Sequence, residues 1–380
     1  MKIKDTLVSW YIKNVLMPKT EDITHPGFLV TKLTKSTGDM SLREIAFPEN
    51  LFVDLENKLT GVYGEPGGQV LYSIGKKFGY GYASLANLPQ LQNSSSEKEF
   101  LDSAYYMVMY VASLFAGEIT HTVDIPSKKF EADMTDYIIC RKNGLGYILS
   151  SGGIAGIWDY AIGDIHVEGV QTACSGRGSK KCHIVCSTPD RLNDLGLKYY
   201  VENELPTLKR TASYEEMNTT RPPQYAQNSL EDLINTGFFD YREGKLNFKG
   251  ERYFICEAHL MYFLEKELQK LPDGEKILFD VSFDFGKNIA ENVKDSQYKK
   301  FMMDYLPALG YGDVLVSSEN ERYKIISSYF PWTEYFTGLK FVLFRGICSG
   351  MLSGFTGKSV TFDKVNTSTV EGYLDLIISS

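Results

Sequence analysis

Apolar positions recur with helical spacing in two stretches of the chain that resemble each other. Residues 43–59, "REIAFPENLFVDLENKL", align with residues 252–268, "RYFICEAHLMYFLEKEL", with leucines and a glutamate at matching places. A second pair of stretches follows, "GGQVLYSIGKKFGYGYA" at 67–83 and "GEKILFDVSFDFGKNIA" at 274–290. Both pairs space their apolar residues three or four positions apart, which predicts two consecutive amphipathic helices in each half.

The repeat continues toward the end of each half. Three glycines of the first half recur with identical spacing in the second: Gly152, Gly156 and Gly163 match Gly346, Gly350 and Gly357. A further helix is expected at about 98–116 and again at 296–307. Strands are expected late in each half, over 132–144, 146–153, 322–330, 337–346 and 371–379.

Early helices and late strands indicate an α+β fold, in which helices pack on a twisted antiparallel sheet. The internal repeat predicts two tandem copies of this domain. The first domain, with an N-terminal extension, is expected to span residues 1–200. A polar linker with three prolines follows at 201–229, and a second, degenerate copy at 230–380.

Composition and charge then narrow the class of protein. The formal net charge of −8 argues against nucleic-acid binding, which usually needs a surplus of Lys and Arg. The longest apolar run, residues 104–117, is too short to span a membrane. Asp5 and Lys13 interrupt the apolar N-terminus, which therefore does not fit a signal peptide. The six scattered cysteines do not form a dense disulfide framework, so we expect a cytoplasmic protein with reduced thiols.

Three cysteines surround or follow the basic turn "CSGRGSKKC" at 174–182. Tetrahedral zinc requires four thiolate, imidazole or carboxylate ligands. The candidate ligands are Cys174, Cys182, Cys186 and Glu168, with His183 and Cys140 as further options. Cys182 and Cys186 would share one face of a strand, which is equally typical of buried packing thiols. The turn lacks the spacing of a phosphate-binding loop, which favours a solvated basic turn over a phosphate site.

Aromatic residues and methionines gather on the helix expected at 98–116. Tyr105, Tyr106, Met109 and Tyr110 are candidate ligand-binding residues, because such groups line apolar cavities. Each of them taken alone is as readily a core residue. A second aromatic group lies at 330–336. None of the five histidines falls in a recognised catalytic pattern, which favours a protein without catalytic activity.

Each half resembles the 4-vinyl-reductase-type domain, a small-molecule-binding module. The matching pieces are the helices after Arg43 and Arg252, the stretch at 67–83, the helix starts "GIAGIW" and "GICSGML", and the hairpin between Cys174 and Cys182. Similar domains occur in a bacteriochlorophyll-biosynthesis protein and in the sensory modules of aromatic-responsive transcription activators. Subunits of TRAPP-like vesicle-tethering complexes are related more distantly, by fold.

The chain departs from the family's closing motif in both halves. The usual glutamate falls on Gln171 in the first half. The second half has Val365 and Ser368 where the first half has Gln171 and Cys174, so it lacks the hairpin thiols. Any zinc is therefore expected in the first copy.

The resemblance implies a sensor-type protein that binds an apolar or aromatic small molecule, held in the first copy between the helices and the sheet. Such a sensor would act through a homodimer or a separate output protein. Two alternatives stay open. One is a tetrapyrrole-related reductase or carrier, and the other is a protein-interaction scaffold whose two copies pack as a pseudo-dimer.

Overall fold

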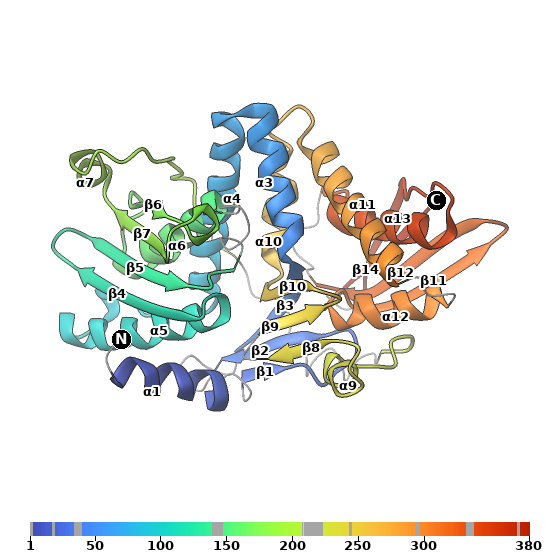
Figure 1. The fold of residues 1–380 in the computed structure, drawn as a ribbon, viewed down its shortest axis with the longest axis horizontal. Coiled ribbons are helices and arrows are strands. Elements are labelled where there is room, and N and C mark those ends of the chain that lie inside the picture. Colours follow the sequence, from blue (N-terminus) through green and yellow to red (C-terminus); the bar gives the residue numbers. More distant parts are fainter. Residues whose placement is uncertain are drawn as a thin grey trace. The chain divides into compact units, whose positions relative to one another are not determined.

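The structure, a computed structural model, describes residues 3–16, 20–33, 40–138, 147–206, 208, 223–242, 245–293, 297–331, 338–370 and 373–380. The chain forms two compact units, whose elements are labelled in Figure 1. Unit 1 consists of Met1–Pro18 and Phe52–Lys209, and unit 2 of Lys19–Leu51 and Arg210–Ser380. Helices pack on antiparallel sheets, so the predicted α+β class is confirmed. No helix of the described residues is long and apolar enough to cross a membrane.

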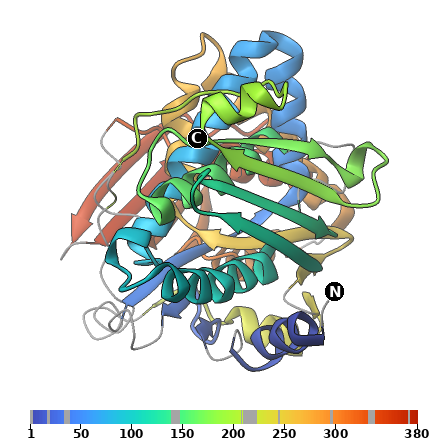
Figure 2. The same ribbon diagram turned by 90° about the vertical axis from the view of Figure 1, so that its left-hand side faces the viewer.

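Unit 1 contains one four-stranded antiparallel sheet, seen in teal and green in Figure 2. Its strands, in spatial order, are β4 (Glu118–Asp124), β5 (Lys129–Thr135), β7 (Cys182–Ser187) and β6 (Glu168–Ala173). Its longer helices are α1 (Ile3–Tyr11), α3 (Glu49–Tyr63, whose first three residues belong to unit 2), α4 (Glu65–Leu85), α5 (Glu97–Phe115) and α6 (Tyr147–Ile162). Shorter helical segments are η1 (Ile12–Leu16), η3 (Leu91–Asn93), η4 (Ser175–Arg177) and α7 (Pro189–Asp194).

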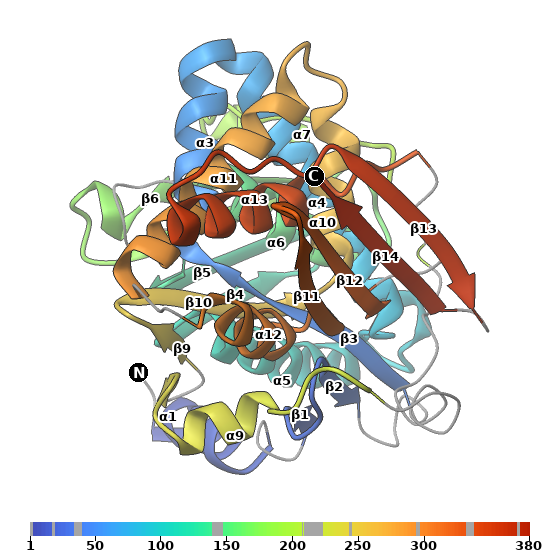
Figure 3. The same cartoon turned by 90° about the vertical axis from the view of Figure 1, so that its right-hand side faces the viewer.

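Unit 2 contains two antiparallel sheets. The six-stranded sheet has the order β1 (Glu21–Asp22), β2 (Leu29–Leu33), β3 (Met40–Pro48), β10 (Glu251–Glu257), β9 (Lys245–Phe248) and β8 (Asp240–Arg242). The four-stranded sheet, orange to red in Figure 3, has the order β11 (Asp313–Glu319), β12 (Arg322–Phe330), β14 (Tyr373–Ser379) and β13 (Lys364–Val370). Among the described residues of unit 2, the helices with given bounds are α9 (Leu230–Asn235), α10 (His259–Leu268), α11 (Gly274–Val293), α12 (Tyr298–Ala308) and α13 (Val342–Thr356).

The unit bounds differ from the expected domain bounds near the N-terminus. The sequence prediction assigns all of residues 1–200 to the first domain, whereas residues 19–51 count with unit 2. The cause is main-chain pairing, because β3 lies between β2 and β10 and forms ladders with both. Of the expected linker at 201–229, the structure describes 201–206, 208 and 223–229.

The four-stranded sheets of the two units have the same topology. When the four strands of each sheet are numbered in chain order, the first strand pairs with the second, the second with the fourth, and the fourth with the third. A helix, α6 or α13, connects the second strand to the third. This common order is what a duplication predicts.

Equivalent glycines also bring equivalent helices together. A Cβ atom on Gly156 of α6 would lie 2.1 Å from the Lys76 carbonyl oxygen of α4, and one on Gly350 of α13 would lie 1.9 Å from the Phe283 carbonyl oxygen of α11. Any larger residue would therefore push either helix pair apart. Lys76 and Phe283 consequently occupy equivalent positions in the two helix pairs.

One of the expected strands is helical over its described residues, and a second is helical over its later half. The sequence predicts strands over 146–153 and 337–346, but α6 begins at Tyr147 and α13 begins at Val342. A helix buried on most sides shows no clear apolar period, so its short apolar run is easily mistaken for a buried strand. The helices at 98–116 and 296–307 and the strands at 322–330 and 371–379 are confirmed as α5, α12, β12 and β14, except for residues 296, 371 and 372, which lie outside the described part. Residues 139–144 of the strand expected at 132–144 lie outside the described part.

Candidate functional site

An apolar cavity of about 70 Å³ lies in unit 1, between α5, α6 and strands β4 and β5. Its lining residues are Met107, Val108, Val111, Ala112, Phe115, Ile119, Phe130, Ala132, Met134, Tyr137, Ile154, Ile157 and Trp158. The indole Nε1 of Trp158 donates a hydrogen bond of 2.9 Å to the Lys128 carbonyl oxygen. This bond fixes the indole ring, whose centroid lies 5.6 Å from that of Phe130.

The size of the cavity limits what it can hold. An apolar cavity of about 150 Å³ in an engineered protein binds benzene, and this cavity has about half that volume. An aromatic ring would therefore fit only if some lining side chains moved. Met107 and Met134 are suited to such movement, because methionine has an unbranched side chain that adapts to irregular spaces.

The four residues that the sequence singles out on α5 lie outside this lining. Met109 is buried, and Tyr110 is half-buried against the core of unit 1. The Tyr105 hydroxyl donates to Asp5 Oδ1 at 2.8 Å, and Tyr106 is 56% exposed. Their role in ligand binding stays a prediction.

The part of α5 that faces the cavity is a helical stripe next to those residues. Val108, Val111, Ala112 and Phe115 are spaced by three, one and three positions, as expected for one face of a helix. Counting this period along α5 would have identified the face. The aromatic and methionine content of α5 instead identified Tyr105, Tyr106, Met109 and Tyr110, which lie outside the lining.

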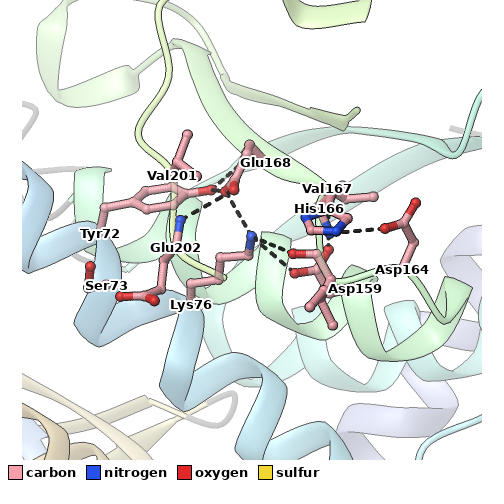
Figure 4. A network of polar contacts seen from close by, with 12 residues as sticks. Tyr72, Ser73, Lys76, Asp159, Asp164, His166, Val167, Glu168, Val201 and Glu202 are labelled. Carbon is pink, nitrogen blue, oxygen red and sulfur yellow. Dashed lines mark hydrogen bonds and ion pairs between the residues drawn. The ribbon is translucent and has the colours of Figure 1, made fainter. Parts of the chain in front are cut away.

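A buried polar network lies on another side of α6, toward α4 and β6 (Figure 4). Lys76 Nζ lies 2.9 Å from Glu168 Oε2 and 3.1 Å from Asp159 Oδ2, and all three side chains are fully buried. The Tyr72 hydroxyl donates to Glu168 Oε2 at 2.6 Å and accepts the Gly169 N–H at 2.8 Å. The Lys76 ammonium group thus contacts two carboxyl groups, those of Asp159 and Glu168.

Backbone groups hold the two carboxyl groups of this network in place. The Val167 N–H donates to Asp159 Oδ1 at 3.0 Å, and the Glu202 N–H donates to Glu168 Oε1 at 3.3 Å. Glu202 lies in the segment expected to be a linker, where its own carboxylate lies 3.4 Å from Lys77 Nζ. The described start of that segment is therefore part of unit 1.

Burial shifts the proton equilibria of the network. Desolvation raises the pKa of Asp159 to about 8, although the nearby Lys76 ammonium opposes the shift. The pKa of Glu168 is also raised by desolvation. Desolvation likewise raises the pKa of the Cys186 thiol, with a smaller contribution from the Asp159 and Glu168 carboxylates. The network therefore retains a carboxyl proton at neutral pH, which reduces the net charge buried there.

Unit 2 has uncharged residues in the equivalent positions. Phe283 matches Lys76, as the contacts of Gly156 and Gly350 show, and Phe279 matches Tyr72 one helical turn earlier. Ser353 of α13 accepts the Val360 N–H at 2.9 Å, as Asp159 of α6 accepts the N–H of Val167. At these three described positions the helix pair of unit 2 therefore has no charged side chain.

The candidate zinc ligands do not form one cluster. Among the described residues, no group of three or more His, Cys, Asp or Glu side chains is placed to hold a metal ion. Cys174 and Cys182 flank the same turn, and the Ser175 N–H donates to Cys182 Sγ at 3.4 Å. Cys186 is four residues further along β7, about 13 Å from Cys182 at the usual strand rise. Glu168 is engaged by Lys76 and Tyr72, and Cys140 lies outside the described residues.

Comparisons with known proteins leave the family open. No family model matches the chain. No curated protein matches it in sequence. Among solved structures, the chain is similar to the crystal structure of the phenol-responsive sensory domain of the transcription activator PoxR with phenol. That match has 14% identity and a TM-score of 0.33, and it covers 49% of this chain and 96% of the other. Membership of the 4-vinyl-reductase-type family stays a prediction.

Proposed function

We propose that unit 1 binds a small apolar or aromatic molecule in the cavity between α5, α6 and β4–β5, and that the protein is a sensor without catalytic activity. The supporting observation is the cavity itself, whose lining consists of aliphatic and aromatic side chains. Ligand pockets are typically apolar, with a few polar groups that orient the ligand. Here the Tyr137 hydroxyl and the Trp158 indole N–H are the polar side-chain groups of the lining.

The two alternative functions receive less support. A tetrapyrrole is several times larger than benzene, so a cavity of about 70 Å³ would have to open widely to admit it. A scaffold would be expected to have a filled core, because an empty apolar cavity lowers stability without serving a partner. The buried network does not supply a catalytic site for the cavity either, because none of its side chains lines it.

The experiment measures thermal unfolding of the full chain with a size series of probes: benzene, toluene, phenol, indole and myristate. A probe that binds only the folded state at about 100 times its dissociation constant adds about 2.7 kcal/mol of stability. We expect the smaller aromatic probes to raise Tm and myristate to leave it unchanged. Ala112→Leu, which projects into the cavity, should abolish the rise.

A matched control separates cavity filling from overpacking. Ala104 lies on the same helix, is equally small and buried, and does not line the cavity. Ala104→Leu should cost about 1–3 kcal/mol. At about 24 cal/mol per Å³, the free energy to be gained by filling 70 Å³ is about 1.7 kcal/mol, so Ala112→Leu should cost less than the control. If the two variants lost equal stability and no probe raised the Tm of the wild type, the ligand-binding proposal would be refuted in favour of the scaffold.

A further inference from the structure

Residues 199–206 lie along α4 without belonging to a helix or a strand. A Cβ atom on Gly68 of α4 would lie 2.2 Å from the Tyr200 hydroxyl oxygen, so the glycine leaves the space that the tyrosine occupies. Further along α4, a Cβ atom on Gly81 would lie 2.5 Å from Leu208 Cδ1. The chain therefore follows the helix closely from one glycine to the other. We call residues 199–206 the strap.

Side chains of α4 and β6 hold the strap. Gln69 Nε2 of α4 donates to the Val201 carbonyl oxygen at 2.8 Å. The Glu202 N–H donates to Glu168 Oε1 of β6 at 3.3 Å (Figure 4). The Glu202 carboxylate lies 3.4 Å from Lys77 Nζ of α4. Two carboxylates, one on β6 and one on the strap itself, are thus among its anchors.

The strap carboxylate also accepts a hydrogen bond from the strap. The Glu204 N–H donates to Glu202 Oε1 at 2.8 Å, whereas the Glu204 side chain is exposed. Hydrogen bonds to an ionised acceptor are stronger than those to a neutral one. The bonds of the Glu202 and Glu204 amides therefore depend on ionised carboxylates, those of Glu168 and Glu202.

The titratable groups that face Glu168 come from α4, α6 and β7. Lys76 Nζ of α4 lies 2.9 Å from Glu168 Oε2, and the Tyr72 hydroxyl of the same helix donates to that oxygen. Asp159 of α6 and Cys186 of β7 interact with Glu168 electrostatically. Burial raises the pKa of Asp159 to about 8 and that of the Cys186 thiol above its usual range, so both keep their protons at neutral pH. Lys76 is then the charged neighbour, and it favours an ionised Glu168.

Docking of the strap and protonation of Glu168 oppose each other. Burial raises the pKa of Glu168, and the bond from the Glu202 N–H is one of the contacts that lower it. A contact that favours the ionised carboxylate must weaken when that carboxyl group takes up a proton. Docking is therefore strongest above the pKa of Glu168 and weakens as pH falls through it.

We propose that the strap is an acid-released segment: it is docked on α4 while Glu168 and Glu202 are ionised, and it leaves α4 when these carboxylates take up protons. The chain passes through the strap on its way from unit 1 to unit 2. Release therefore adds about 26 Å of extended chain, at roughly 3.3 Å per residue, to the connection between the units. No strap residue is among those that line the cavity, so the device stands or falls separately from the proposed ligand binding.

The test is hydrogen exchange of the full chain, measured by mass spectrometry at about pH 7.5 and about pH 4.5 and corrected for the effect of pH on intrinsic exchange. We expect the protection factor of a peptide that covers the strap to fall at least about fivefold in acid, because its carboxylate acceptors are neutralised. A peptide from β7 should keep its protection, because release of the strap leaves the strand ladders of the sheet in place. Loss of protection in both peptides together would mean acid unfolding of unit 1 and would overturn the proposal. So would a strap that is equally protected, or unprotected, at the two pH values.

Two glutamate variants complete the test. Glu202→Gln should lower the protection of the strap at about pH 7.5 at least about threefold, because it removes the ion pair with Lys77 and the charged acceptor of the Glu204 N–H. It should also reduce the difference between the two pH values. Glu204→Gln is the matched control, because it removes the same charge from an exposed side chain of the strap, and it should behave as the wild type. Equal protection factors in the two variants would contradict the proposal.

Discussion

Replacing Lys76 by methionine should destabilise unit 1 by about 3–5 kcal/mol, because it removes the cation from a buried network and leaves the Glu168 carboxylate uncompensated. At an effective dielectric constant of about 20, unit charges at the 2.9 Å separation of Lys76 Nζ and Glu168 Oε2 attract by about 6 kcal/mol. Desolvation of the buried pair offsets most of this gain. The loss of unfolding free energy in the variant is thus mainly the cost of a carboxylate that is buried without a counter-ion.

The same reasoning predicts a partial rescue. Glu168→Gln removes the charge and keeps one acceptor oxygen, which can serve either the Tyr72 hydroxyl or the Glu202 N–H, because these donors bond different carboxylate oxygens. Adding it to Lys76→Met should therefore restore about 1–3 kcal/mol, which a double-mutant cycle measures as coupling. Lys77→Met is the matched control, because Lys77 is also buried but lies 3.4 Å from its carboxylate, and it should cost less.

The assay is urea unfolding followed by tryptophan fluorescence in a Trp332→Phe background. The two remaining tryptophans, Trp10 and Trp158, then both lie in unit 1. The unfolding of unit 1 can thereby be separated from that of unit 2. A loss below about 1 kcal/mol for Lys76→Met, or strictly additive effects in the double variant, would refute an electrostatically coupled network.

Two further predictions concern protons and zinc. Because the pKa of Asp159 is raised from 3.8 to about 8, the folded state holds one proton more than the unfolded state between these values, so stability should fall as pH rises through that window. The slope of stability against pH is at most about 1.4 kcal/mol per pH unit, and Asp159→Asn should flatten it. A wild-type stability that does not change over this range would contradict the raised pKa of Asp159. Any zinc that mass spectrometry detects in the purified protein should disappear in Cys174→Ser and persist in Cys256→Ser of unit 2. Zinc that survives Cys174→Ser would exclude the hairpin as its site.

The repeated helices were accessible to sequence reasoning because they are amphipathic. Leu51, Leu55 and Leu59 of α3 follow the helical period and are all buried. The same period fails for α6, whose sequence is apolar around much of its circumference. The glycines of α6 were visible as a repeat, but their close contacts with α4 appear only in the fold.

The buried network could not be predicted from spacing. Lys76 sits in a stretch of glycines, lysines and aromatics that gives no sign of a fully buried ammonium group. Its partners Asp159 and Glu168 are more than 80 residues away along the chain. Asp159 and Glu168 also belong to different elements, brought together by the return of the chain after α6. Such a cluster is a property of tertiary packing, which a local pattern does not record.

The pairing of β3 with β10 has a consequence for how the chain is made. Ala46 lies opposite Ile255, and these two positions are also equivalent in the sequence repeat, so the strands pair about their common midpoint as in a two-fold dimer. About 200 residues separate them, which at roughly 5–20 residues per second is about 10–40 s of translation. During that time β3 has a free edge that can pair with other extended chains. Productive folding of unit 2 therefore depends on protecting this strand, by a chaperone or by transient local structure, until β10 has been synthesised.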